Sequence, residues 1–99
     1  MIPKTLRKVS RLEPKNLVER GLKLCEENGE LAAEIFKLLG KKKSQVTKKQ
    51  TLANLREEAV DCLIMSMDIL AHTNTSNRQV KRLFDKKMKK WLDKMENRS

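Results

Sequence analysis

Apolar residues recur at the spacing of one helical face over the first half of the 99-residue chain. From about residue 15 to residue 39 a stripe follows the period of 3.6 residues, and neighbouring leucines and an isoleucine widen it. The stripe consists of Val18, Leu22, Cys25, Gly29, Ala32, Phe36 and Leu39. We expect a long helix here, which Gly40 is suited to end, and the small Gly29 would let a neighbouring helix approach closely.

A second helix, which Thr51 can cap, is expected from about Leu52 to His72, and its sequence is unusually apolar. At 100° per residue, four of its polar side chains and one methionine fall within a sector of about 80°, and the opposite side is apolar. The sector holds Asn54, Glu58, Asp61, Met65 and Asp68. We therefore expect this helix to be buried on most sides, where charged side chains are costly unless they are paired or bind a metal.

A third helix is predicted from about Arg78 to Asn97, after a polar turn over residues 73–77 in which Ser76 or Asn77 can cap it. Lysines occupy the face opposite its apolar stripe. The stripe consists of Val80, Leu83, Phe84, Met88, Trp91, Leu92 and Met95. This segment therefore predicts a basic amphipathic helix.

The remaining segments are basic and carry no long apolar pattern. Residues 1–14 are expected to form a basic N-terminal arm or a short helix, and residues 41–50 an exposed, mobile, lysine-rich loop. No segment alternates between apolar and polar residues as a strand does. The sequence thus predicts an all-α fold in one domain over residues 1–99, an antiparallel helical bundle of three long helices plus the N-terminal helix or arm.

The second predicted helix indicates association between copies of the chain. It has more apolar circumference than the neighbouring helices of a monomer of this length can cover. A chain of 99 residues also has limited surface to bury in a core of its own. We therefore expect oligomerisation to complete the bundle, as a homodimer or a dimer of dimers.

The formal net charge of +10 favours an anionic partner, which can be a nucleic acid, a nucleotide or an acidic protein. The charges are segregated along the chain. Acidic residues gather at residues 26–34 and 57–68, whereas basic residues crowd into residues 4–11, 41–49 and 78–98. The chain therefore combines acidic centres with basic flanks.

Several classes of protein and site are disfavoured by the sequence. No apolar run approaches the roughly 18–20 residues that span a membrane, and the N-terminus lacks the apolar stretch of a secretory signal. Cys25 and Cys62 each lie in an apolar helical pattern, which favours two buried free thiols over a disulfide. No zinc-ligand spacing, glycine-rich phosphate loop or nucleophile–histidine arrangement is present. We expect a cytoplasmic protein without a membrane partner.

Two groups of carboxylates offer candidate chemistry. Glu27, Glu30 and Glu34 would stack on one face of the first long helix, where like charges repel. Glu58 and Asp61 repeat the i, i+3 spacing on the second helix, so antiparallel packing would bring the two groups to one cleft. Mg²⁺ is commonly held by a few carboxylates together with water and substrate phosphates. The alternative is a solvated acidic face, which is harder to maintain for the pair on the apolar second helix.

These carboxylates also carry a family resemblance. The segments Glu26-Glu27-Asn28-Gly29-Glu30-Leu31 and Glu58-Ala59-Val60-Asp61 resemble the E-x-x-E … E-x-x-D signature of MazG-like, all-α nucleoside triphosphate pyrophosphohydrolases. The resemblance covers roughly residues 15–95. It implies a Mg²⁺-dependent enzyme, with Mn²⁺ as a substitute, that hydrolyses nucleoside or deoxynucleoside triphosphates between the α and β phosphates to the monophosphate and pyrophosphate.

The resemblance also assigns roles to individual residues. The implied metal ligands are Glu27, Glu30, Glu58 and Asp61. Glu27 and Glu30 are the implied catalytic residues, one of which would orient or deprotonate the attacking water. Helical spacing, and not the resemblance, adds Glu34 and Asp68, which extend the two acidic faces toward the periphery of the site. The fourth helix of such protomers would be residues 4–12 here or come from a partner chain.

The last predicted helix carries a second part of the resemblance. The segment Lys87-Met88-Lys89-Lys90-Trp91 is similar to the basic and aromatic segment in the last helix of the family. The resemblance implies that Lys87 and Lys90 contact substrate phosphates. On spacing alone, such lysines are more often a solvated face, and Trp91 in an apolar stripe is more often a core residue than a platform for a base.

Two other functions stay open beside hydrolysis. The net charge of +10 suits a small basic helical nucleic-acid-binding protein, whose binding would weaken steeply with salt. That function leaves the acidic residues of the central helices unexplained. A non-catalytic helical scaffold is the third hypothesis, and the presence of all four motif carboxylates argues against it. The sequence therefore favours the pyrophosphohydrolase.

Overall fold

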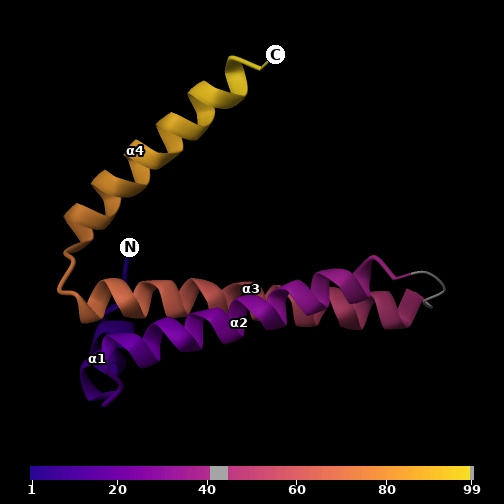
Figure 1. Ribbon diagram of the computed structural model, residues 1–99, viewed down its shortest axis with the longest axis horizontal. Helices are drawn as coiled ribbons and strands as arrows, with labels where there is room; N and C mark the ends of the chain where they lie inside the picture. The colour runs from indigo at the N-terminus through magenta and orange to yellow at the C-terminus, as the bar shows by residue number, and fades with distance from the viewer. Residues whose placement is uncertain (41–44, 99) are drawn as a thin grey trace.

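The computed structural model describes residues 1–40 and 45–98, which form four helices and no strand (Figure 1). The helices are α1 (Lys4–Leu12), α2 (Leu17–Leu38), α3 (Gln45–His72) and α4 (Asn77–Glu96). The prediction of an all-α fold is confirmed for this part of the chain, and the N-terminal segment is a helix of nine residues rather than an arm. None of the described helices is long and apolar enough to cross a membrane.

Helix α2 begins where its sequence provides a cap. The Asn16 side chain accepts a hydrogen bond from the Glu19 backbone N–H at 2.9 Å, and Glu19 Oε1 accepts one from the Asn16 backbone N–H at 3.2 Å. This reciprocal capping box satisfies N–H groups that the start of a helix leaves unpaired. The helix ends at Leu38, shortly before Gly40, so both boundaries lie close to the predicted ones.

Helix α3 begins earlier than its apolar pattern indicates. The prediction of a lysine-rich loop over residues 41–50 is wrong for residues 45–50, which form the first turns of α3. The rest of that prediction, over residues 41–44, lies outside the described part of the chain. Lysine and glutamine are good helix formers and no glycine or proline interrupts the segment, so the helix extends beyond its apolar residues. Thr51 is therefore a buried residue inside α3 and not its cap.

A tight polar turn separates α3 from α4. Asn74 adopts the left-handed conformation with a φ of 57°, which asparagine tolerates better than most residues. The Thr73 hydroxyl donates to the carbonyl oxygens of Ile69 and Leu70, at 2.9 and 3.1 Å. These bonds satisfy carbonyl groups at the C-terminal end of α3, where intrahelical partners run out. Ser76 then caps α4, which confirms one of the two predicted caps.

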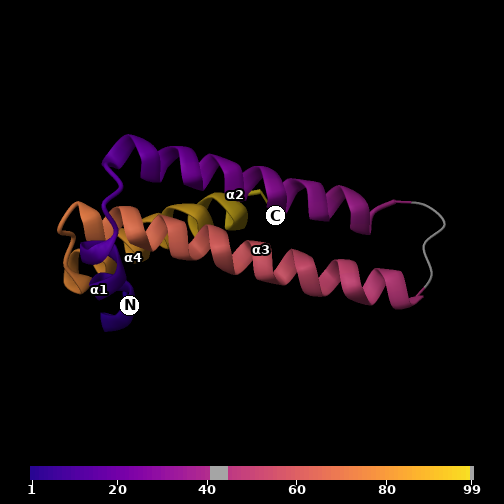
Figure 2. The same ribbon diagram turned by 90° about the horizontal axis from the view of Figure 1, so that it is seen from below.

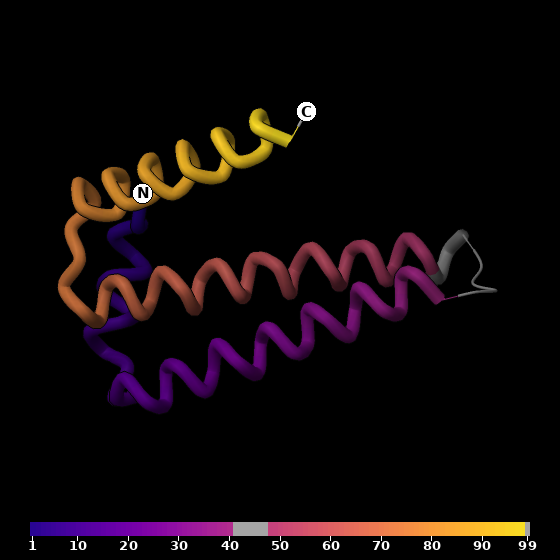
Figure 3. Tube along the Cα trace, turned by 45° about the horizontal axis from the view of Figure 1, so that its top comes forward, coloured from indigo at the N-terminus to yellow at the C-terminus, as the bar shows by residue number. Residues whose placement is uncertain are grey.

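Helices α2 and α3 form an antiparallel hairpin that makes up the body of the molecule (Figures 1 and 3). Helix α1 packs against α3 at the end of the hairpin where α2 begins and α3 ends (Figure 2). Helix α4 leaves the hairpin at an angle after the turn (Figure 1). The Cα radius of gyration is 16.8 Å, against about 13 Å for a compact domain of 100 residues. The single chain is thus extended, and a bundle that includes α4 stays a prediction about its assembly.

The predicted apolar stripe of α2 faces outward. All seven of its positions are exposed in the chain, and Phe36 retains 74% of its full exposure. The side turned toward α3 instead carries Arg20 and Glu27, which are buried. The prediction of a buried Cys25 is wrong, because this residue lies on the outward stripe, and Cys62 is half-buried. The face that an isolated helical chain would normally bury is therefore open.

Helix α3 shows the same inversion. Val60, Leu63 and Ile64 on its apolar side are exposed, whereas Glu58 and Asp61 are half-buried. The prediction of a helix buried on most sides is therefore wrong for the single chain. The reason is that α2 covers the polar sector of α3, and helix α4 does not return to cover the apolar remainder.

Helix α4 is joined to the rest of the chain near its first turn. The Asn77 side-chain oxygen accepts hydrogen bonds from the Ile2 backbone N–H at 3.1 Å and from the Arg7 guanidinium at 2.9 Å. Val80 is buried, and among the described residues only Ile2 shares that burial as a hydrophobic side chain. Beyond this joint the apolar stripe, Trp91 included, is exposed. The exposed positions are Leu83, Phe84, Met88, Trp91, Leu92 and Met95.

Candidate metal centre

The interface between α2 and α3, which we call the polar seam, is lined by charged side chains. Along α2, Arg20, Glu27 and Glu34 recur every seven residues and therefore share one helical face. Each has buried side-chain atoms, which shows that this face is turned toward α3. The polar sector predicted on α3 lies opposite, since Asp68 pairs with Arg20 and Glu58 lies close to Glu27.

Three carboxylates of the polar seam form a compact group, which we call the carboxylate cluster. Glu27 from α2 and Glu58 and Asp61 from α3 each place one carboxylate oxygen within 4.8 Å of the other two. Glu27 belongs to a second group of the same spacing, with Glu26 and Glu30, which are both exposed. The structure therefore brings the other three predicted ligands close to Glu27: Glu58 and Asp61 in the cluster and Glu30 beside it.

Several carboxylate oxygens in the polar seam are buried without a hydrogen-bond donor. They are Glu27 Oε2, Glu34 Oε2 and Glu58 Oε2. Glu27 is the most deeply buried of these residues, with 7% of its surface exposed. A buried carboxylate oxygen that lacks a partner is costly, and a hard divalent cation would supply the positive charge that these oxygens lack. The donor set of the cluster therefore fits Mg²⁺ or Mn²⁺.

Lys23 places a positive charge at the edge of the cluster. Its Nζ lies 3.2 Å from Glu27 Oε1 and 3.4 Å from Glu26 Oε1. The hydrogen bond to Glu27, followed by the charge of Glu26, raises the pKa of Lys23, and the same hydrogen bond lowers the pKa of Glu27. Sequence reasoning missed this lysine, although its i, i+4 spacing to Glu27 was a usable signal. Lys23 is an internal counter-ion for the α2 side of the cluster.

Crowding of the carboxylates changes the protonation of Glu58. Burial, followed by the negative charges of Glu30 and Glu27, raises the pKa of Glu58 to about 7. Cys62 lies one turn beyond Glu58, and burial, followed by the charge of Glu27, raises the pKa of its thiol. Without a cation, the cluster therefore carries less than its full negative charge near neutral pH.

The predicted phosphate contacts are not brought to the cluster within one chain. Lys87 and Lys90 are exposed on α4, which diverges from the hairpin (Figure 1). The turn after α3 directs α4 away from the end of the hairpin, so these lysines face solvent in the single chain. If they serve the carboxylate cluster, they do so across an interface between copies.

The two residues predicted at the periphery differ in their surroundings. Glu34 lies on the polar seam, where its Oε1 is 3.2 Å from Lys37 Nζ and its Oε2 is buried. Asp68 accepts a hydrogen bond from the buried guanidinium of Arg20 and lies outside the carboxylate cluster. Sequence reasoning missed Arg20 as its partner. The usable signal was the seven-residue spacing that places Arg20 on the same face of α2 as Glu27.

Comparisons with models of protein families, with curated proteins and with solved structures find no match.

Proposed function

We propose that the chain is a Mg²⁺-dependent nucleoside triphosphate pyrophosphohydrolase, as the MazG-like resemblance implies. The observation that carries the proposal is the carboxylate cluster of Glu27, Glu58 and Asp61, with Glu30 beside it. Buried oxygens of the cluster lack hydrogen-bond donors, which fits a cation as their partner. The same four side chains are the ones that the resemblance assigns to the metal, so the motif and the geometry support one site.

In the proposed reaction a water molecule attacks the α phosphorus of the triphosphate. A new P–O bond forms, the bond from the α phosphorus to the bridging oxygen breaks, and pyrophosphate leaves with that electron pair. The proton of the water passes to a carboxylate of α2, for which Glu27 and Glu30 are the candidates. Mg²⁺, when bound, would offset the negative charge of the phosphates. The part of the protein is to hold the water and the triphosphate in line for the attack.

Pyrophosphate release from a panel of ribonucleoside and deoxyribonucleoside triphosphates with Mg²⁺ tests this proposal. We expect release from at least one nucleotide, and a loss of at least about 100-fold in Glu58→Gln, because a neutral amide is a poor replacement for a carboxylate ligand. The matched control is Glu57→Gln, which changes the adjacent, exposed glutamate outside the cluster and should keep its rate. The absence of release from every nucleotide, or equal rates for the two variants, would contradict the proposal.

We further propose that the active form is a homodimer or a dimer of dimers. The accessible surface of the single chain is 8039 Å², whereas a compact protein of 11.5 kDa exposes about 5,800 Å². The excess of about 2,200 Å² per chain, or about 4,400 Å² per pair, lies in the range that obligate homodimers bury. The outward faces of α2, α3 and α4 supply this surface.

A second copy of the chain is the partner that best fits these faces. Helix α4 carries eight lysines and arginines against three acidic residues, whereas α2 and α3 together carry nine acidic residues against six basic ones. Helix α4 of one copy can therefore meet the hairpin of another with complementary charge. In that arrangement Lys87 and Lys90 of one copy would approach the carboxylate cluster of the other. Light scattering at micromolar concentration should give two or four times 11.5 kDa, and a monomer would overturn this part of the proposal.

Nucleic-acid binding is the second candidate function, and the exposed basic face of α4 favours it. Binding of a nucleic-acid duplex in a gel shift should then weaken steeply as the salt concentration rises. An absent or salt-insensitive shift would remove this candidate.

A helical scaffold without activity is the third candidate function. Calorimetry that showed no Mg²⁺ binding, even with nucleotide present, would favour it. The enzyme is preferred because it alone explains the buried carboxylates of the polar seam.

A cytoplasmic location forms part of the proposed function. Cys25 and Cys62 are free thiols, which a reducing compartment preserves. Nucleoside triphosphates, the proposed substrates, are also intracellular. Fractionation of cells that express the untagged chain should recover it with the cytoplasmic proteins, and recovery from an oxidising compartment would contradict the location.

A further inference from the structure

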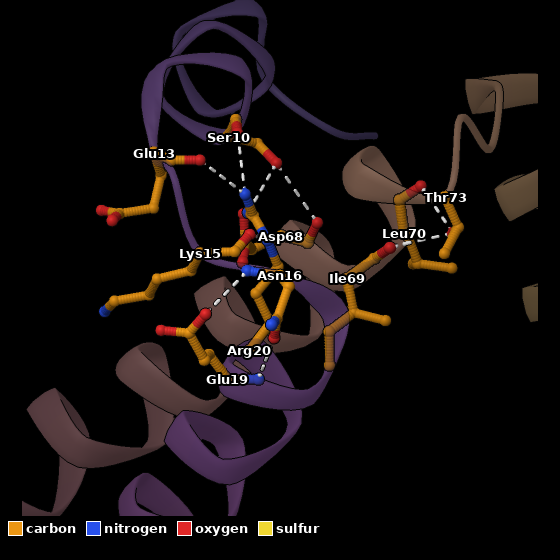
Figure 4. Close-up of polar contacts among 10 residues, drawn as sticks. All are labelled: Ser10, Glu13, Lys15, Asn16, Glu19, Arg20, Asp68, Ile69, Leu70 and Thr73. Atoms are coloured by element: carbon orange, nitrogen blue, oxygen red, sulfur yellow. Dashed lines mark hydrogen bonds and ion pairs between the residues drawn. The ribbon is translucent and has the colours of Figure 1, made fainter.

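A buried network around Arg20 joins three helices at one end of the hairpin (Figure 4). Arg20 is 2% exposed, and its Nη2 donates to the carbonyl oxygens of Ser10 at 3.1 Å and Glu13 at 2.9 Å. Its Nε donates to the carbonyl oxygen of Lys15 at 2.9 Å. Its Nη1 donates to Ser10 Oγ at 3.1 Å and to Asp68 Oδ1 at 2.5 Å. A guanidinium has five N–H groups, so the network uses all of them.

The Arg20–Asp68 pair lies on the same helical faces as the carboxylate cluster. Arg20 precedes Glu27 by seven residues on α2, and Asp68 follows Asp61 by seven residues on α3. Seven residues make nearly two full turns, so each pair of residues shares a face and is separated by about 10.5 Å along its helix axis. The ion pair is therefore a second meeting point along the polar seam, in register with the one at which Glu27 and Asp61 place carboxylate oxygens within 4.8 Å of each other.

A buried arginine with every donor used tolerates little displacement. A shift of α2 by one residue along α3 would rotate its face by about 100° and move it by about 1.5 Å. That shift would break the bonds of Arg20 to α1, to the connection before α2 and to α3 together, and would leave a buried charge without partners. Apolar packing along the seam is less restrictive, because Leu24 and Leu31 are only half-buried there.

We propose that Arg20 and Asp68 are a positioning pair for the carboxylate cluster: their buried network fixes the register of α2 against α3 and thereby holds Glu27 opposite Glu58 and Asp61. This inference rests on the proposed function. We assign the pair no role as a metal ligand, because Asp68 lies outside the carboxylate cluster and its Oδ1 accepts a hydrogen bond from the guanidinium. Since the ligands of a metal must be held to within about 0.5 Å, a small change of register lowers the affinity.

Binding of Mn²⁺ to the full chain, followed by electron paramagnetic resonance, measures this geometry without turnover. We expect Arg20→Lys to weaken Mn²⁺ binding by about 10- to 100-fold, at a temperature at which circular dichroism shows the variant to be folded. Lysine keeps the charge but gathers its donors on one nitrogen, so it cannot reach both helices and the connection. Asp68→Asn keeps an oxygen opposite the guanidinium and should weaken binding by a smaller factor.

The matched control is Val80→Ala, which trims a buried side chain at the joint of α4, away from the polar seam. It should lower the Tm and leave the affinity for Mn²⁺ unchanged, which separates lost stability from lost positioning. A second readout is the Mg²⁺ dependence of hydrolysis. The Mg²⁺ concentration for half-maximal rate should rise in Arg20→Lys, and saturating Mg²⁺ should restore most of the rate.

If Arg20→Lys does not fold, Ser10→Ala is the milder test, because it removes one acceptor of the network. Ser10→Ala should also weaken Mn²⁺ binding, but only a few-fold. Unchanged affinity in the folded variants, while the unmodified chain binds Mn²⁺, would overturn the positioning pair and leave the proposed function intact. An unmodified chain that binds no Mn²⁺ would contradict the proposed function and the inference together.

Discussion

The polar seam and the outer faces of the same two helices show opposite patterns of burial. The seam buries charged side chains, Arg20 and Glu27 among them, whereas Leu22 and Phe36 on the outer face of α2 are exposed. Both halves of this arrangement are unfavourable in an isolated chain, because buried charges lose their hydration and apolar surface stays in water. The proposed function gives the two surfaces different partners: a cation with its nucleotide for the seam, and a second copy for the outer faces.

A charge on the outer face of α2 should have the largest effect. Phe36→Glu would bury an unpaired carboxylate in the proposed interface, at a cost of several kcal/mol, so the affinity between copies should fall by at least about 100-fold. Light scattering over a dilution series measures the change. Phe36→Leu keeps the surface apolar and should associate nearly as well as the unmodified chain. Equal association of the unmodified chain and both variants would show that the outer face of α2 is not the interface between copies.

Removal of a charge from the seam should stabilise the metal-free protein. The pKa of Glu58 is raised from 4.5 to about 7 in the folded chain, so the folded state holds a proton at pH values at which the unfolded chain has lost it. The contribution of Glu58 to stability is therefore lost as the pH rises from about 4.5 to 7. Glu58→Gln should reduce this loss of stability with rising pH, and it should raise the Tm at pH 7.5 in the presence of a chelator. A lower Tm for Glu58→Gln would show that other groups of the metal-free seam already compensate the charge of Glu58.

Loss of the internal counter-ion should tighten the binding of a cation. Lys23 competes for Glu27, so Lys23→Met should strengthen Mn²⁺ binding by about two- to fivefold, the scale of a partly exposed ion pair. Lys37→Met is the control, because Lys37 pairs with Glu34 at the other end of α2. Calorimetry measures both variants. Weaker binding in Lys23→Met would mean that the lysine supports the cluster and does not compete with the cation.

The smallest effect is expected at Gly29. A Cβ added there would meet no heavy atom within 4 Å in the single chain, and the same holds for Gly21. In a dissociated Phe36→Glu background, alanine at either position should therefore stabilise the helix by up to about 1 kcal/mol. In the associated protein Gly29→Ala should gain less, because the outer face approaches its partner there. Equal gains in thermal melts of both backgrounds would exclude a close approach at Gly29.

Periodicity predicted where α2 lies but not what its stripe contacts. The spacing through Leu22 and Phe36 records which residues share a face, and it placed the ends of the helix near Leu17 and Leu38. The partner of that face depends on which of the available apolar surfaces packs best against it, including the surfaces of other copies. A single sequence does not show which one that is. The start of α3 was missed for a related reason, since residues 45–50 form helix through propensity without an apolar period.

The candidate site, like the fold, was predicted only in part from the sequence. Helical spacing alone was enough to place the acidic residues on two faces that the hairpin turns toward each other, and their role as ligands stays a prediction. Arg20 was not foreseen, because an arginine in a helix usually lies at the surface. Its burial depends on the carbonyl oxygens of Ser10 and Glu13, which only the position of α1 supplies. The pattern that we used describes only α2 and α3, so it does not predict a contact that depends on the position of α1.

The Arg20 network also sets an order of events while the chain is being made. Its carbonyl partners leave the ribosome before Arg20, but Asp68 follows Arg20 by 48 residues. At a synthesis rate of about 5–20 residues per second, this separation takes about 2–10 s. During that time the guanidinium has only local partners and stays hydrated. Because Glu58 and Asp61 are made shortly before Asp68, the nascent hairpin receives the two acidic residues of α3 proposed as ligands and the proposed positioning residue almost together.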